Sequence, residues 1–226
     1  MKRILLLASI LFFFQVSTQA QLFRFGIKGG VSSSKFSVDK TMLQDIQTTQ
    51  GVRDILIEQG ESKLGLHFGV FGRVQITGLF IQPELLFTQT RGEFVVNEVD
   101  PSNTQQTIES IAEQKFNKFD IPVMIGWKFG PARVGLGPVA SVMLSEKDGL
   151  MDKINNLSDE TVESGLNKAV FGYQVGVGLD ILKFATLDLK YEGNLSKLGE
   201  SITIGDQNFA FDQRNPQFIV SLGIFF

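Results

Sequence analysis

Charged side chains are the residues of this sequence whose types and spacing could support chemistry. Eleven of them alternate with apolar residues inside short strand-like stretches: Arg24, Lys28, Arg73, Glu84, Asp120, Lys128, Arg133, Asp180, Asp188, Lys190 and Glu192. Six are basic and five are acidic, and this near balance suits a network of buried ion pairs, because a buried unpaired charge is costly. Such a set could act as a selectivity filter, as a proton path or as a polar plug.

Acid–base catalysis would depend on His67, the only histidine. A Ser–His–acid triad needs the histidine beside a serine and an acid. The alternating pattern places His67 on the same face as the charges, and no serine is clearly its neighbour. We therefore expect His67 to join a hydrogen-bond network, and we expect no enzyme activity.

Sites for metals and cofactors have no support in the sequence. It contains no HExxH motif, no DxDxDG loop and no cysteine. Gly135-Leu-Gly137 and Gly176-Val-Gly178 lie in strand-like stretches and do not form a GxGxxG loop that opens a helix. The absence of cysteine also excludes disulfides, thiol catalysis and an N-terminal lipid-modified cysteine. The formal charge of −3 is too small to suggest a nucleic-acid partner.

The elements that must position the charges are eight stretches in which apolar and other residues alternate. This period of two predicts strands with two different faces. No residue of the apolar face is charged, although 20% of the chain is. A lipid-facing band requires this, because Arg or Lys near the bilayer midplane costs about 2–4 kcal/mol. The stretches are 23–31, 64–75, 79–90, 119–129, 133–144, 171–181, 185–192 and 217–226.

The connections between the stretches alternate in length. Short turns are expected around residues 76–78, 130–131 and 182–183, and long loops at 35–62, 92–115, 145–168 and 196–216. This pattern predicts an all-β fold: an eight-stranded antiparallel up-and-down transmembrane β-barrel with short periplasmic turns and long extracellular loops. Eight strands leave room for little besides side chains, so the polar plug is favoured over an open pore.

Two long loops contain apolar residues at helical spacing. Val52, Ile55 and Leu56 form one set, and Met151, Ile154 and Leu157 form the other, so each loop is predicted to contain a short helix. Such helices could cap the mouth of the barrel or bind a partner, because rigid scaffolds often carry function on loops. The alternative is a solvated crown that only shields the barrel.

The first twenty residues are predicted to be a signal peptide. Lys2 and Arg3 precede an apolar run over 4–14, and small residues before the Ala20–Gln21 bond match a cleavage site. The mature domain is then 21–226, exported across the inner membrane. The run is too short for a membrane-spanning helix, which needs about 20 apolar residues.

A soluble, lipocalin-like cup is the alternative fold, because it also has eight alternating strands but turns its apolar face inward. Glycines on the charged face argue against it: Gly65, Gly69, Gly126, Gly135, Gly137, Gly172, Gly176 and Gly178. Small residues suit a crowded lumen. On a solvated exterior they would only weaken the strands.

Six segments resemble the PorT-like family of outer-membrane β-barrel proteins, common in Bacteroidota. They are FGIKGGVSSSKF at 25–36, FIQPELLFTQTRGE at 80–93, KFDIPVMIGWKFG at 118–130, RVGLGPVASVMLSEK at 133–147, FGYQVGVGLDILKFATLDLKYEGNLSKLG at 171–199 and RNPQFIVSLGIFF at 214–226. The resemblance implies an outer-membrane location and the eight-strand fold. It implies little about activity: one branch of this family serves a protein-secretion and gliding apparatus, while most members have no assigned role. An extracellular or secretion-system protein is the partner class that this branch suggests. This chain departs from common members by its scarce tyrosine and its long first loop.

The end of the sequence looks like the signal that barrel-assembly machinery recognises. It is formed by Phe218, Val220, Leu222, Ile224 and Phe226. The function expected from the sequence is a structural or interaction scaffold in outer-membrane lipid, with a plugged lumen and with extracellular loops that bind another protein. A narrow pore for ions or small solutes is the first alternative. A lipid-modifying outer-membrane enzyme is the second.

Overall fold

The computed structural model describes residues 23–34, 37–38, 41–48, 51–100, 103–157, 162–204 and 207–226. The expected signal peptide, with Ala20 and Gln21 at its cleavage site, lies outside these residues. Eight long strands form a closed ring: β1 (Phe23–Ser34), β4 (Gly51–Ile76), β5 (Leu79–Asp100), β6 (Asn103–Phe129), β7 (Ala132–Asp148), β9 (Ala169–Ile181), β10 (Ala185–Asn194) and β13 (Gln217–Phe225).

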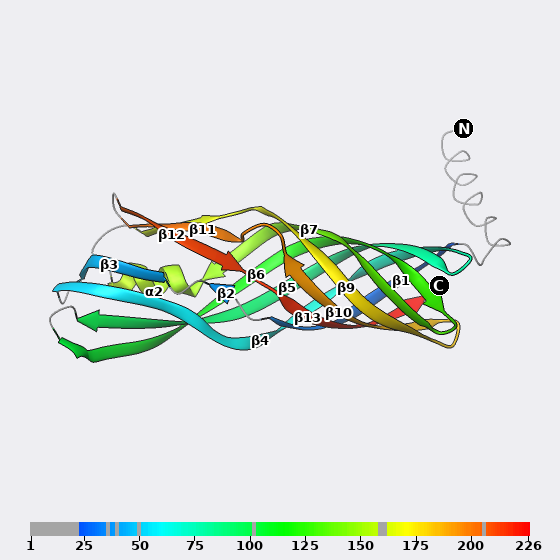
Figure 1. Cartoon of the computed structure of the whole chain (residues 1–226), viewed down its shortest axis with the longest axis horizontal. Coiled ribbons are helices and arrows are strands. Elements are labelled where there is room, and N and C mark those ends of the chain that lie inside the picture. The colour runs from blue at the N-terminus through cyan, green and yellow to red at the C-terminus, as the bar shows by residue number, and fades with distance from the viewer. Residues whose placement is uncertain are drawn as a thin grey trace, which may run out of the picture.

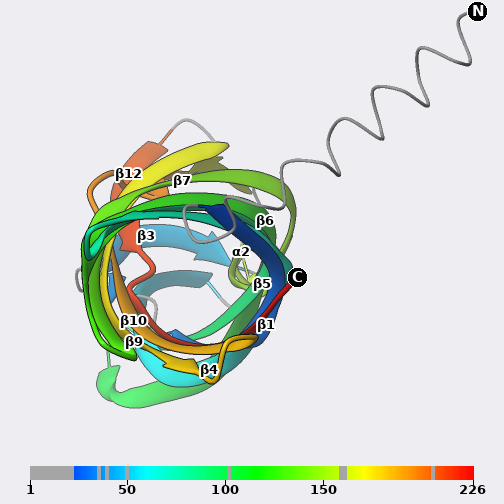
Figure 2. The same cartoon turned by 90° about the vertical axis from the view of Figure 1, so that its right-hand side faces the viewer.

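The ring is closed by β1, which pairs antiparallel with both β4 and β13. Every other strand of the ring pairs antiparallel with its neighbours, and Figure 2 shows the closed circle along the barrel axis. Closure leaves no strand edge in lipid, where an unpaired backbone group would be expensive. The predicted all-β, eight-stranded antiparallel up-and-down barrel is confirmed.

Three short turns join strands at one end of the barrel, as predicted. Thr77 and Gly78 both have positive φ, 45° and 89°, which is the requirement of the tight hairpin turns that match strand twist. Gly130 (φ 61°) and Leu182 (φ 57°) begin the other two turns. In Figure 1 this end also holds the C-terminus.

The outward face of the barrel is apolar and exposed. Phe68, Trp127 and Leu136 are 62%, 57% and 68% exposed, and comparable side chains continue around the ring. Water would make an apolar surface of this extent unfavourable, whereas lipid makes it necessary. Within the described residues, no helix is both long enough and apolar enough to cross a membrane.

At the other end, β4, β5 and β6 run far beyond the lipid-facing band (Figure 1). β3 (Thr41–Thr48) pairs with β4, and a separate four-stranded sheet has the order β2 (Ser37–Val38), β12 (Gln207–Arg214), β11 (Gly199–Ile204) and β8 (Val162–Leu166). A helix, α2 (Gly149–Leu157), completes this part. We call the described residues of 35–63, 91–117, 145–168 and 196–214 the crown.

The crown differs from the long loops expected at this end, because its described residues are mostly strand. The helix predicted around Val52, Ile55 and Leu56 is wrong: these residues belong to β4. Ile55 instead pairs with Leu43 of β3 in the sheet register and is fully buried. Strand partners on both sides outweigh the local helical spacing. The helix predicted around Met151, Ile154 and Leu157 is confirmed as α2.

The crown has a hydrophobic core, which begins where the polar lumen ends. Along β5 the inward residues change from Glu84 and Thr88 in the barrel to Phe94 and Val96 in the crown. Strands of the crown and α2 surround this core, and Val170 of β9 adds to it from the barrel side. Its buried members are Leu43, Ile46, Ile55, Ile57, Phe94, Val96, Ala112, Phe116, Leu150, Met151, Ile154, Val170, Leu198, Ile202 and Ile204.

Candidate functional site

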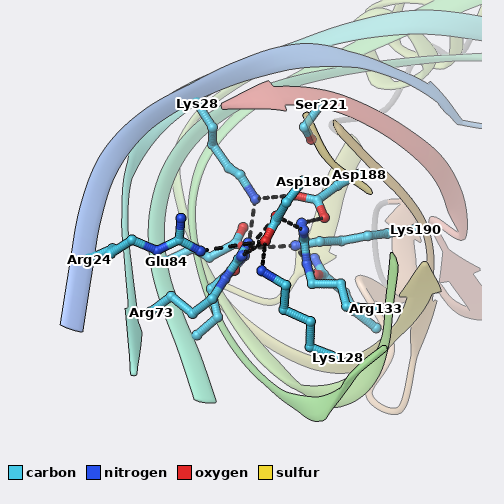
Figure 3. A network of polar contacts seen from close by, with 12 residues as sticks. Arg24, Lys28, Arg73, Glu84, Lys128, Arg133, Asp180, Asp188, Lys190 and Ser221 are labelled. Atoms are coloured by element: carbon cyan, nitrogen blue, oxygen red, sulfur yellow. Dashed lines mark hydrogen bonds and ion pairs between the residues drawn. The ribbon is translucent and has the colours of Figure 1, made fainter. Parts of the chain in front are cut away.

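The lumen contains the eleven charged residues singled out in the sequence. Nine of them are buried, while the side chains of Arg24 and Lys128 are 24% and 17% exposed. They reach the lumen because they occupy one parity of each strand, so that the pleat turns them all inward. Figure 3 shows the ten labelled residues, nine of them charged, converging on the middle of the barrel. Their ion pairs divide into three clusters along the barrel axis.

The mouth cluster lies at the short-turn end and surrounds Asp180 of β9. Its carboxylate contacts Arg24 Nη2 at 3.4 Å, Arg73 Nη1 at 2.9 Å, and both Lys128 Nζ and Arg133 Nη1 at 2.5 Å. These cations lie near the ends of β1, β4, β6 and β7 that are at the short-turn end of the barrel. One carboxylate therefore faces four cations, and the mouth cluster is strongly positive.

The middle cluster is electrically balanced. Glu84 Oε1 accepts hydrogen bonds from Lys28 Nζ at 2.8 Å and from Lys190 Nζ at 2.7 Å. Asp188 accepts from Lys28 at 2.9 Å and also from Arg133, which links this cluster to the mouth. Two lysines already meet these two carboxylates and Arg133 adds a third cation, so the middle cluster has no surplus negative charge for its neighbour.

The outer cluster lies nearest the crown and includes a residue that the sequence reasoning missed. Lys118 Nζ lies between Asp120, at 3.0 Å, and Glu192, at 3.3 Å. Gln174 and Gln217 complete the shell of Glu192 with hydrogen bonds of 2.7 and 2.8 Å. The signal was present in the sequence, because Lys118 precedes Asp120 by two positions. It was missed because the strand was assumed to begin at Phe119.

His67 has a serine neighbour, contrary to expectation. Its Nε2 lies 2.8 Å from Ser221 Oγ of β13, which reaches it across β1. The two side chains are 4% and 2% exposed, inside the lumen and away from lipid. Among the hydrogen bonds of the described residues, none joins His67 to a carboxylate. The arrangement is a Ser–His pair without the acid that a triad requires.

Small cavities lie between the described residues of the lumen. A cavity of about 10 Å³ lies beside His67 and Ser221, and another of about 10 Å³ lies beside Arg133 and Asp188. Each has room for about one water molecule. No group of three or more His, Asp or Glu side chains in the described part of the chain is arranged to hold a metal ion.

Comparison with known families agrees with this geometry. Residues 18–199 match the family described as the outer membrane protein beta-barrel domain. The chain belongs to this family. Members of this family are outer-membrane proteins, so the location predicted from the sequence is confirmed. No curated protein matches the chain.

Several solved structures of other proteins align with this chain. OprG from Pseudomonas aeruginosa aligns with a TM-score of 0.51 at 11% identity, over 91% of this chain and 96% of that one. Ail of Yersinia pestis aligns over 91% of this chain and 100% of its own, with a TM-score of 0.43 and 14% identity. Neisserial surface protein A gives 0.45 and 12%, over 88% and 96%. At such identities the likeness to OprG supports the fold alone.

Proposed function

We propose that the protein is a closed scaffold of the outer membrane whose crown binds a macromolecular partner at the cell surface. The observation that carries this proposal is the apolar core of the crown. Leu150 and Ile154 of α2 are fully buried in it, and α2 lies within the outline of the ring in Figure 2. An ion leaving the lumen would have to cross packed hydrocarbon side chains without water.

The ion pairs of the lumen support the same proposal. Lys28, Glu84 and Lys190 are each less than 5% exposed and are joined at 2.7–2.8 Å. An ion passing through would have to separate them, which would leave charges buried and unpaired. The lumen is thus filled by its own side chains in the membrane and covered by an apolar core outside it.

The crown offers a surface suited to a basic partner. Its described residues include fifteen acidic and nine basic ones, so charge complementarity favours a positively charged protein segment. A groove of about 490 Å³ crosses β4, β5 and β6 on the outside of the crown, with Glu61, Glu109 and Ile111 in its lining. Ile111 is 64% exposed there, which provides an apolar anchor beside the acidic groups.

The resemblance to the PorT-like family suggests which kind of protein this partner is. A protein of a secretion apparatus, or another extracellular protein, is the partner that the resemblance suggests. A photocrosslinking residue at Ile111 should yield a discrete adduct in cells, whereas one at Lys183, in a turn at the opposite end, should not yield the same adduct. Absence of any adduct from Ile111 and Glu109 would overturn the assignment of this groove.

Conductance tests whether the scaffold is closed. The refolded protein, checked by heat-modifiable gel mobility, should give no current steps in a planar bilayer. Reproducible steps from folded wild-type protein would overturn the closed scaffold and favour a narrow pore for ions or small solutes. In that case the charged residues of the lumen would be its filter.

A lipid-modifying enzyme remains the other alternative, because His67 and Ser221 form a hydrogen-bonded pair. Their burial inside the lumen speaks against it, since a lipid substrate would approach from the outer face. His67→Ala should leave the acylation of lipopolysaccharide unchanged. Altered acylation in this variant would reverse the conclusion.

We also propose that β13 is the segment read by the barrel-assembly machinery. Its outward residues Phe218, Val220, Leu222 and Ile224, and the terminal Phe226 that follows the strand, are 43–69% exposed. The strand pairs with both β10 and β1, so its addition closes the ring. The barrel wall thus has two proposed partners. Its exposed apolar face favours outer-membrane lipid, and β13 is the segment that the assembly machinery would bind.

A further inference from the structure

The mouth cluster contains more positive charge than its own residues neutralise. Arg24, Arg73, Lys128 and Arg133 share the single carboxylate of Asp180. The middle cluster cannot supply the missing charge, because its two carboxylates already face two lysines and one of them, Asp188, also binds Arg133. A concentration of like charge in a region of low dielectric is unfavourable, so the cluster favours an additional anion.

Two members of the mouth cluster are open to water at the short-turn end. Arg24 and Lys128 are 24% and 17% exposed at their side chains, whereas Arg73 and Arg133 are nearly closed, at 1% and 3%. The turn residue Lys183 lies at the same end, and its carbonyl oxygen accepts a long hydrogen bond of 3.4 Å from Arg24 Nη1. An anion from the periplasmic side would therefore meet Arg24 and Lys128 first.

The arginines of the mouth keep donors that Asp180 does not satisfy. Arg24 Nη2 contacts Asp180 at 3.4 Å, which is at the outer limit of a hydrogen bond. Its guanidinium stacks on the ring of Phe225, with Cζ 4.0 Å from the ring centroid, and a stacked guanidinium keeps the N–H groups of its edge available. Deeper in the cluster, Arg73 Nη2 is buried and has no hydrogen-bond partner.

We propose that the mouth cluster is a binding site for a phosphate-type oxyanion, which Arg24 and Lys128 contact from the water-facing side of Asp180. Guanidinium groups bind such anions through paired N–H···O bonds, and lysine adds a point charge. Figure 3 shows the cations around Asp180 on which the anion would be seated. The inference goes beyond the scaffold function and does not depend on whether the lumen conducts.

Calorimetry with inorganic phosphate tests the site. Refolded protein in vesicles of zwitterionic lipid should bind phosphate saturably at constant ionic strength, with chloride as the background anion. The double variant Arg24→Gln/Lys128→Gln should lose at least tenfold in affinity, because it removes both water-facing cations. Lys183→Gln is the matched control, since it removes a positive charge at the same end without touching Asp180, and its affinity should stay within about twofold of wild type.

A second measurement keeps the proposal testable if the double variant folds poorly. Asp180→Asn removes the internal anion that competes with phosphate, so phosphate should raise the urea midpoint of this variant more than that of wild type. Equal midpoints with and without phosphate in both proteins would overturn the proposal. So would equal phosphate affinity in wild type and in a folded double variant.

The source of the oxyanion is separated by changing the lipid. If a lipid headgroup occupies the site, vesicles that contain phosphatidylglycerol should block the binding of free phosphate in wild type but not change the double variant. If the ligand is soluble, phosphate affinity should be the same in both kinds of vesicle. Both results support a phosphate-type site. Failure of phosphate to bind in zwitterionic vesicles, together with no lipid effect, would overturn it.

Discussion

The guanidinium of Arg133 occupies the space in which a side chain at Gly178 would lie. A Cβ built on Gly178 would stand 2.4 Å from Cζ of Arg133 and 2.5 Å from its Nη2. The two residues face each other in the register of β7 and β9. The glycine therefore makes room for an arginine that binds Asp180 and Asp188 in two clusters.

Gly178→Ala should displace Arg133 and destabilise the barrel by about 1–3 kcal/mol, the usual cost of overfilling a packed interior. Gly29→Ala in β1 is the matched control, because a Cβ there would meet its nearest atom at an ordinary 3.4 Å. Urea unfolding in lipid vesicles, followed by the fluorescence of Trp127, measures both. Equal midpoints would mean that Arg133 moves aside without cost.

Asp180→Asn should destabilise the protein by about 3–5 kcal/mol, because removal of one member of a buried ion pair leaves its partners unpaired. The control is Asp212→Asn in the crown. Asp212 pairs with Lys197 at 2.7 Å, but both side chains are more than a third exposed, at 34% and 40%. Because water screens such a pair, this change should lower the free energy of unfolding by no more than about 1 kcal/mol. Similar losses in the two variants would contradict the role given to Asp180.

The barrel could be predicted from the sequence because one rule, alternation with an uncharged outer face, governs every residue in contact with lipid. The same rule pointed Arg73, Asp120 and Asp188 inward. It could not predict which cations share Asp180, because ion-pair partners come from strands far apart in the chain. Contacts such as that of His67 with Ser221 also depend on closure of the ring, which local pattern does not contain.

The sequence predicted loops where the crown lies, because the apolar face of the strands changes there from the outward side to the inward side. In β5 the even positions stay inward throughout, but they are polar at Glu84 and Thr88 and apolar at Phe94 and Val96. A search for apolar outward faces therefore stops at the edge of the lipid band. A search for continued period two, whichever face is apolar, would have extended β4, β5 and β6 into the crown.

Leu150→Ala should loosen the crown while leaving the barrel folded. Leu150 is fully buried in the core of the crown, and such a truncation costs about 2–5 kcal/mol. Limited proteolysis should cut the crown faster in this variant, while heat-modifiable mobility of the barrel persists. Asn156→Ala, at an exposed position of the same helix, should match wild type. Unchanged proteolysis of Leu150→Ala would contradict a packed crown.

Phe226→Asp should impair assembly in cells. The ring of Phe226 lies 5.7 Å from that of Phe25 across the β13–β1 seam, and a carboxylate at this position would disturb both the seam and the proposed signal. The expected result is a lower amount of heat-modifiable protein in outer-membrane fractions. The control is Phe209→Asp in the crown strand β12. It should disturb the packing of the crown but leave the amount of protein in the outer membrane unchanged. Normal membrane levels of Phe226→Asp would count against the signal.

The boundary between lipid and water can be located with two residues of nearly equal exposure. Ile111 on β6 and Leu136 on β7 are 64% and 68% exposed and both point outward. The structure places Leu136 in the lipid band and Ile111 in the crown.

Leu136→Lys should therefore cost about 2–4 kcal/mol, depending on its depth in the bilayer. Ile111→Lys should change stability by less than about 0.5 kcal/mol, as surface substitutions in water usually do. Unfolding free energies measured in the same vesicles give the comparison. A large loss for Ile111→Lys would move the bilayer edge into the crown, because only lipid makes an exposed lysine so costly.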